Sequence, residues 1–280
     1  MSQSIVSIVA EPSGTLIVDL VTTDGESFFS VLTPLRDIAE TRANMPSDEL
    51  YNGAFWLVDV CLSPEGHIYA CDAEGNVHTN ASGAWQVEPV TPGAGLRVVR
   101  VLPDGSVFAA GNAGTVHRRS PDGWLAVGES LGAGITSLDG RSADDLAICG
   151  DAGLVAVLSG DRWTRPDLAT KMPLNTVLAQ AEGYMVGGAG GALFRSVGGV
   201  WNRLGGSSLD FHGLVSYRGE VWSACGSAGA ARVAPDGSVE IMRNTFAAFS
   251  IHAAEPYIAF AGNQTAVRFD GTEWKGRRYG

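Results

Sequence analysis

The chain has 280 residues, of which 45% are hydrophobic and 18% are charged, so it can bury a large core and does not resemble a disordered segment. Its formal net charge is −11, from 19 basic and 30 acidic residues, and this negative field disfavours nucleic acid and anionic membranes as partners. We therefore expect a globular protein that binds neither.

The N-terminal sequence MSQSIVSIVAEPSG has no basic residue before its short apolar run, which ends at Glu11 and Pro12. This pattern is typical of neither a signal peptide nor a membrane span. None of the four cysteines has C-x-x-C spacing, and we interpret them as small buried thiols: Cys61, Cys71, Cys149 and Cys225. These features predict a cytoplasmic protein.

The first segment of the chain covers residues 1–54. Residues 5–9 and 15–21 are expected to form a hairpin around Pro12, Ser13 and Gly14, and residues 26–32 a third strand. Residues 33–54 do not fit the later repeat and are interpreted as an insertion. Within it, a short helix is expected near residues 34–42, with Thr33 as its cap.

From residue 55 the chain consists of repeats. Their most regular marker is a tryptophan, and the steps between successive positions are 39, 39, 38, 38 and 35 residues. The positions are Trp85, Trp124, Trp163, Trp201, Val239 and Trp274. A Gly-rich break precedes each position, and a tight turn marks the start of each repeat. Residues 98–124 show the whole unit, which predicts four short strands.

Seven such units, counting residues 1–54, give about 40 residues per unit, which is the length of a four-stranded propeller blade. We therefore predict one all-β domain over residues 1–280, a seven-bladed β-propeller of antiparallel blades. The alternative is a ring of six blades preceded by an N-terminal hairpin, if residues 33–54 supply no fourth strand.

Three half-repeats carry a family resemblance: GDAGLVAVLSGDRW at 150–163, GNAGTVHRRSPDGW at 111–124 and GNQTAVRFDGTEW at 262–274. They resemble the bacterial β-propellers whose repeats read roughly D-V-W-A-V-G-D-x-G-T-I-x-H-x-D-G-x-x-W, within the WD40-like, YVTN-like and BNR-like propellers. The resemblance extends from Phe55 onward. It implies a seven- or eight-bladed propeller whose motif residues are structural, and it implies no particular activity.

Catalysis in a propeller channel would need polar residues on several first strands at one level. The candidates are Asp59, Arg97, Arg100, Asp139, Asn175, His212 and His252. They do not coincide when the blades are aligned on their turns, so we expect no metal, no cofactor and no catalytic residue. His78 and His117 do align, on third strands, and are interpreted as packing residues.

The partner-binding surface is expected on the blade-to-blade loops, because these segments depart most from the repeat and combine charges with aromatic residues or Met. The predicted partner-binding residues are Arg165, Asp167, Lys171, Met172, Asp210, Phe211, His212, Arg243, Asn244 and Phe246. Phe211, Phe246 and Met172 are the predicted anchors, although the two Phe side chains would serve equally well as plugs of the channel mouth.

The function favoured by the sequence is a non-enzymatic scaffold or adaptor that acts as a monomer on a protein partner. The acidity favours a basic intracellular partner, as for an antitoxin-like inhibitor or an effector adaptor. The alternative is an enzyme, a hydrolase or lyase, or a small-molecule binder with its site in the central channel. The basic run Lys275-Gly276-Arg277-Arg278 is interpreted as a solvated terminus.

Overall fold

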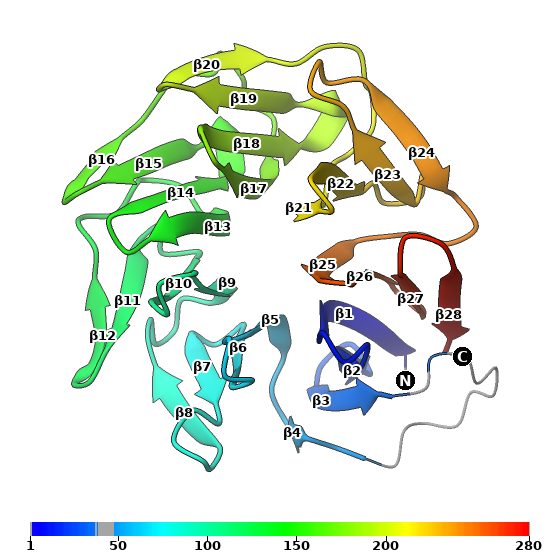
Figure 1. The fold of residues 1–280 in the computed structure, drawn as a ribbon. Coiled ribbons are helices and arrows are strands. Elements are labelled where there is room, and N and C mark those ends of the chain that lie inside the picture. Colours follow the sequence, from blue (N-terminus) through cyan, green and yellow to red (C-terminus); the bar gives the residue numbers. More distant parts are fainter. Residues whose placement is uncertain (1, 37, 39–47, 280) are drawn as a thin grey trace. The chain divides into compact units, whose positions relative to one another are not determined.

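A computed structural model describes residues 2–36, 38 and 48–279. The described residues form 28 β-strands in seven four-stranded antiparallel sheets, together with two short 3₁₀ turns. In every sheet the strands are paired in chain order. The protein is thus a seven-bladed β-propeller, and Figure 1 follows the blades along the chain from blue to red. The predicted fold is confirmed.

The chain divides into two compact units. Unit 1 consists of Met1–Leu57, His212–Pro235 and Val239–Gly280, and unit 2 of Val58–Phe211 and Asp236–Ser238. Unit 1 contains blades one, six and seven. Unit 2 contains blades two to five.

The strands of unit 1 form three sheets. Blade one contains β1 (Ser2–Ala10), β2 (Leu16–Thr23), β3 (Phe28–Leu35) and β4 (Tyr51–Gly53). Blade six contains β21 (Gly213–Tyr217), β22 (Glu220–Ala224), β23 (Ala230–Val233) and β24 (Val239–Arg243). Blade seven contains β25 (Ser250–Ala254), β26 (Tyr257–Gly262), β27 (Thr265–Phe269) and β28 (Trp274–Arg278).

The strands of unit 2 form four sheets. Blade two contains β5 (Leu57–Leu62), β6 (Ile68–Asp72), β7 (Asn76–Thr79) and β8 (Gln86–Pro89). Blade three contains β9 (Leu96–Val101), β10 (Val107–Gly111), β11 (Val116–Ser120) and β12 (Gly123–Ala126). Blade four contains β13 (Ile135–Ser142), β14 (Asp145–Gly150), η1 (Asp151–Gly153), β15 (Val155–Ser159) and β16 (Arg162–Thr164). Blade five contains β17 (Leu174–Gln180), β18 (Gly183–Gly188), η2 (Ala189–Gly191), β19 (Leu193–Val197) and β20 (Val200–Arg203).

Blade one is complete, because β4 pairs with β3 from Ser30 opposite Gly53 to Leu32 opposite Tyr51. The sequence alternative of six blades plus a hairpin is therefore wrong. The expected helix cannot begin at Thr33, because Thr33, Pro34 and Leu35 belong to β3. The rest of that expected helix, residue 37 and residues 39–42, lies outside the described residues.

The Gly-rich break after each second strand has a steric cause. Gly75, Gly153 and Gly229 all have positive φ, at 100°, 76° and 86°. A Cβ on any of them would lie 2.1 Å from a carbonyl oxygen at the end of the fourth strand of the blade or in the loop that follows it. Only glycine combines this backbone conformation with so close an approach. The repeated glycine thus holds each blade-to-blade loop against its own blade.

The core lies between neighbouring blades, where the faces of the sheets meet. One buried cluster joins blades three and four through Phe108, Leu138 and Ile148, and equivalent clusters join the other neighbours within each unit. The repeated Trp side chains lie at the outer margin of these clusters. Trp163 packs on the cluster of blades three and four, and its Nε1–H donates to the carbonyl of Val127 at 2.8 Å.

Blades one and seven pack together inside unit 1 without sharing a strand. Ile5, Leu16 and Tyr279 form a buried cluster with Ala259 and other residues of blade seven. In Figure 1 the blue strand β1 lies beside β25 and β26, with which it is in contact. Among the described residues, no helix is long and apolar enough to span a membrane.

Candidate functional site

Polar side chains on the first strands accept hydrogen bonds from backbone N–H groups of the next blade. The N–H of Val99 donates to Asp59 Oδ2 at 3.1 Å, and the N–H of Ala179 donates to Asp139 Oδ2 at 2.7 Å. In unit 1, the N–H of Ala10 donates to His252 Nδ1 at 3.1 Å. A first strand has one edge without a strand neighbour, and buried N–H groups there require acceptors. Asp59, Asp139 and His252 supply those acceptors.

The remaining channel candidates also have partners within the protein. Arg97 forms a salt bridge with Asp151 at 2.9 Å, Arg100 Nε donates to the carbonyl of Leu138 at 3.3 Å, and Asn175 Nδ2 donates to the carbonyl of Phe211 at 3.1 Å. Across residues 2–36, 38 and 48–279, no group of three or more His, Cys, Asp or Glu side chains is placed to hold a metal ion.

Asp139 and Arg100 influence each other electrostatically. Burial raises the pKa of Asp139, and the guanidinium of Arg100 and the N–H of Ala179 oppose this rise only in part. Burial would lower the pKa of Arg100, but the carboxylates of Asp59 and Asp139 outweigh it, so that pKa is raised. Two carboxylates thus compensate the partly buried cation of Arg100 and link β5, β9 and β13 electrostatically.

The two aligned histidines are packed in the sheets, as the sequence indicates. His78 Nε2 lies 2.9 Å from Asp72 Oδ2, and both side chains are buried. Asp72 also accepts the N–H groups of Glu74 and Asn76. Burial lowers the pKa of His117.

Two of the three predicted anchors belong to the core. Phe211 is 0% exposed, and Phe246 is 9% exposed and packs against Phe260 and Trp274 at centroid distances of 5.9 and 6.1 Å. Rings buried in this way pack within the protein and do not project into a partner as anchors. The expectation of aromatic anchors at these two positions is therefore corrected. Met172, in contrast, is 45% exposed.

Met172 and Asp210 meet at the η2 turn of unit 2, although they come from successive blade-to-blade loops. The N–H of Gly190 donates to Asp210 Oδ1 at 2.7 Å. A Cβ placed on Gly190 would lie 3.1 Å from Met172 Cε. An exposed apolar side chain and a carboxylate thus flank one glycine turn, and the exposed Lys171 precedes Met172.

Arg165 and Asp167 border a neighbouring hollow of about 390 Å³ in unit 2. Arg165 Nη1 donates to the carbonyl of Leu131 at 2.9 Å, and Asp167 Oδ1 accepts the N–H of Ala169 at 2.8 Å. Asp151 and Leu168 also line the hollow. Both predicted charges therefore lie on the surface formed by the loops of blade four.

The other predicted surface residues, His212, Arg243 and Asn244, belong to unit 1. His212 contacts Phe249 edge to face at a centroid distance of 5.1 Å. Arg243 and Asn244 are exposed, and Arg243 Nε donates to Thr245 Oγ1 at 3.1 Å. The guanidinium of Arg243 lies 5.5 Å from the centre of the Trp274 ring.

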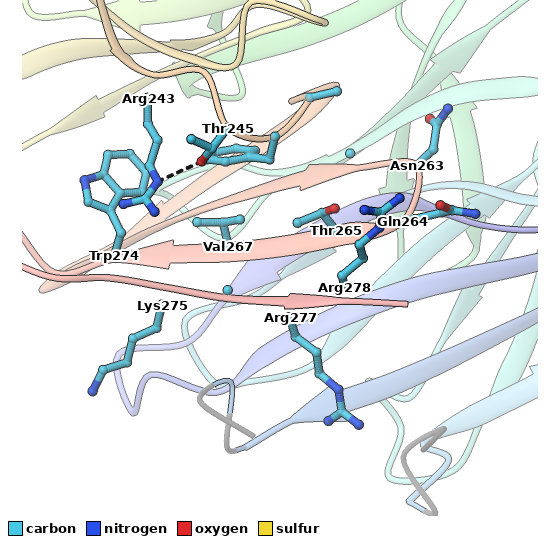
Figure 2. A pocket seen from close by; sticks show the side chains of 14 residues that line it. Arg243, Thr245, Asn263, Gln264, Thr265, Val267, Trp274, Lys275, Arg277 and Arg278 are labelled. Carbon is cyan, nitrogen blue, oxygen red and sulfur yellow. Dashed lines mark hydrogen bonds between the residues drawn. The ribbon is translucent and has the colours of Figure 1, made fainter. Parts of the chain in front are cut away.

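Unit 1 contains a groove that no sequence pattern indicated. The groove measures about 530 Å³, and its lining includes Arg243, Val267, Trp274, Gly276 and Arg278. Figure 2 shows the guanidinium groups of Arg243 and Arg278 on one side of β28. The basic run read as a solvated terminus is in fact strand β28, paired with β27. The alternation of its side chains along a strand was the available signal.

A second groove, of about 870 Å³, lies between blades four and five in unit 2. Arg141 binds Asp145 at 2.6 Å, and the hydroxyl of Tyr184 donates to Asp145 Oδ1 at 2.6 Å. Burial raises the pKa of Tyr184, and the hydrogen bond to Asp145 raises it further. These groups satisfy one another and so act as a structural contact between the blades.

Comparison with known proteins defines the fold and no closer relationship. No protein family and no curated protein sequence matches the chain. The WD40 β-propeller domain of Doa1 superposes with a TM-score of 0.74 at 13% identity, covering 97% of this chain and 94% of that one. A chain of the mitotic checkpoint complex gives 0.69 at 12% identity, covering 98% and 90%. YCF48 bound to D1 peptide gives 0.61 at 11% identity, covering 80% and 81%. The chain is similar to WD40 β-propellers in fold.

Proposed function

We propose that this protein is a non-enzymatic scaffold that binds a protein partner through the loop surface of unit 2. The observation that carries the proposal is the exposed Met172 beside Asp210 at the η2 turn. Met is flexible and polarizable, and an apolar side chain with charged neighbours is the usual composition of a contact patch.

We further propose that the partner is basic. The chain carries a net charge of −11, and Asp151, Asp167 and Asp210 all lie on this loop surface. Such a field accelerates the encounter with a cationic protein. An antitoxin-like inhibitor or an effector adaptor would act in this way.

Two further observations support a binding role. The first-strand side chains that a channel enzyme would use are engaged with neighbouring blades. Two structures of the same fold were determined as assemblies, the mitotic checkpoint complex and YCF48 with D1 peptide. All four cysteines are buried, which fits a monomer working in a reducing compartment.

The test is affinity capture from native lysate with the wild-type protein, Met172→Glu and a matched control, Leu125→Glu. Leu125 is 61% exposed on β12, away from the loops, so it reports general effects of a new surface charge. We expect one partner to be retained by wild type and control and to lose about tenfold or more in affinity with Met172→Glu. Equal capture by all three proteins would reject this surface, and an acidic partner would reject the charge argument.

A further inference from the structure

The groove between blades six and seven is unusual for its charge. The chain carries 30 acidic and 19 basic residues, yet none of the described residues that line this groove is an Asp or Glu. Four of them are basic: Arg243, Lys275, Arg277 and Arg278. All of them belong to unit 1.

Only two of these cations face the groove. Arg278 pairs with Thr265 and Gly276 with Val267 across β27 and β28, so Arg278, Gly276 and Trp274 share one face of the sheet. Lys275 and Arg277 alternate with them, and Figure 2 shows their side chains leaving the strand on the opposite side. Lys275 is bound there by Glu273 at 3.2 Å.

The two groove cations remain available. Within the described part of the chain, neither Arg243 nor Arg278 takes part in a salt bridge. The hydrogen bond to Thr245 and the contact with Trp274 hold the Arg243 guanidinium in place through its Nε and its face. Its terminal nitrogens are left for a carboxylate, which guanidinium binds through paired N–H donors.

The groove has apolar side chains at its base and polar ones, such as Thr245 and Thr265, along its lining. Val267 and Phe246 are buried below it, and Trp274 closes one end. Gly276 adds no side chain between Trp274 and Arg278, so the centre of the groove stays open. A ligand with an apolar group in the middle and anionic groups toward the ends would complement this arrangement.

The length of the strand decides between a small anion and a peptide. Arg278 and Trp274, over which Arg243 lies, are four residues apart in β28. At about 3.3 Å per residue the Cα atoms of Trp274 and Arg278 are about 13 Å apart, a length that suits an extended peptide better than a single phosphate or carboxylate. Residues i, i+2 and i+4 of an extended peptide lie on one side and span the same length.

We propose that this groove binds an extended acidic segment of a partner protein, with acidic side chains at i and i+4 and an apolar side chain at i+2. The acidic groups bind Arg243 and Arg278, and the apolar group fills the space over Gly276. This site rests on the proposed role as a protein-binding scaffold, but it is independent of the loop surface of unit 2 and of a basic partner.

The test is isothermal titration calorimetry with synthetic peptides at low salt. The probe carries the pattern Glu-Ser-Val-Ser-Glu, and a scrambled peptide places the same two Glu residues side by side. We expect the spaced peptide to bind about tenfold more tightly than the scrambled one, because only it reaches both arginines. Equal affinity for both peptides, or no detectable binding of either, would overturn the proposal.

Two double variants each remove two positive charges, one pair from the groove side of the blade-seven sheet and the other from its opposite side. Arg243→Gln with Arg278→Gln should weaken the spaced peptide about tenfold or more, and Lys275→Gln with Arg277→Gln should change it less than about threefold. Similar losses in both would show a general charge effect and reject the groove. Circular dichroism confirms that each variant is folded.

A third variant tests the apolar centre without changing charge. In Gly276→Val the new Cβ lies 3.1 Å from Val267 Cγ2, so the side chain fits with a small adjustment and occupies the floor. We expect it to weaken the spaced peptide about tenfold. Unchanged peptide affinity in Gly276→Val, or full competition by inorganic phosphate at equal concentration, would indicate a small-anion site and overturn the peptide proposal. The Met172→Glu capture experiment fails or succeeds independently of all these results.

Discussion

At the scale of single residues, the outer margin of the blades is held by aromatic side chains with polar tips. Trp163 packs on the buried cluster of blades three and four and donates a hydrogen bond to the carbonyl of Val127. Trp124 packs on the cluster of blades two and three, and its Nε1–H donates to Glu88 Oε2 at 2.8 Å. Each indole is half-buried. Its ring fills space between neighbouring blades while its N–H satisfies an acceptor of the earlier blade.

Truncation of Trp163 should therefore be costly. We expect Trp163→Ala to lower the free energy of unfolding by about 3 kcal/mol, the lower range for large aromatic deletions, because the ring is only half-buried. Trp163→Phe keeps most of the packing and should lose about 1 kcal/mol with the hydrogen bond. Urea unfolding measures both, and a loss below about 1 kcal/mol in Trp163→Ala would contradict the packing role.

The Glu88 carboxylate should make stability depend on pH. Burial alone would raise its pKa, but hydrogen bonds from Arg119 and Trp124 outweigh burial, so the folded pKa lies below the unfolded value. Such a group contributes its full stability above the unfolded pKa and loses it as the pH falls through the folded pKa. We expect Glu88→Gln to be less stable than wild type by about 1–3 kcal/mol at pH 7.

The difference should shrink as the pH falls from 5 to 3, because protonation removes the same charge from the wild-type protein. Thermal unfolding at several pH values follows this convergence. A gap that stays constant down to pH 3 would show that Glu88 acts by shape and not by charge.

At the scale of elements, the first strands explain how the blades are joined. The inner edge of each first strand lacks a neighbouring strand, so its N–H groups take side-chain acceptors from the preceding blade. Ser137 and Asp139 of β13 accept from Val177 and Ala179 of β17, each 40 residues later. The step equals one repeat, which means that the same contact is copied from blade to blade.

Asp59 offers a test of this contact. Asp59→Ala would leave the N–H of Val99 without this acceptor and remove a carboxylate that compensates Arg100. We expect a loss of about 3 kcal/mol, and a smaller loss in Asp59→Asn, which keeps an acceptor oxygen. Asp122→Ala, on an exposed turn, serves as the charge control and should stay within about 0.5 kcal/mol. Equal effects of Asp59→Ala and Asp122→Ala in urea unfolding would refute the role.

At the scale of the whole molecule, the two ends of the chain are joined by packing in unit 1. Blade one and blade seven each contain four consecutive strands, so no strand is exchanged between them. Their contact includes a buried cluster, a hydrogen bond from the N–H of Ile5 to the carbonyl of Asn263 at 2.7 Å, and the acceptors Ser250 and His252.

The double variant Ser250→Ala with His252→Ala should weaken this junction. It removes the acceptors of the Ile8 and Ala10 N–H groups, and we expect a loss of about 1–3 kcal/mol, or a fall in Tm of several degrees. Hydrogen exchange localises the effect, because the amides of residues 8 and 10 should exchange faster while those of β17 do not. Uniform exchange across the chain would contradict a local junction.

The sequence alone was sufficient for the fold, because each repeat encodes its blade locally. Turn glycines with positive φ, alternating strands and the Trp step predict four strands per unit, and these signals do not depend on distant contacts. They failed at β4, a three-residue strand separated from β3 by 15 residues, because so short a strand is specified by the neighbour that it pairs with.

Only the tertiary structure decided what the polar and aromatic residues do. From the sequence, Asp59, Asp139 and His252 are equally compatible with binding a ligand and with accepting hydrogen bonds from a neighbouring blade. Phe211 and Phe246 are equally compatible with a partner contact and with the core. The sequence does not show which backbone groups and rings of other blades lie within reach. The same holds for β28, where strand pairing places Arg278 beside the groove that Arg243 enters from blade six. Burial and partnership are properties of the assembled blades, so they appear only when the blades are placed together.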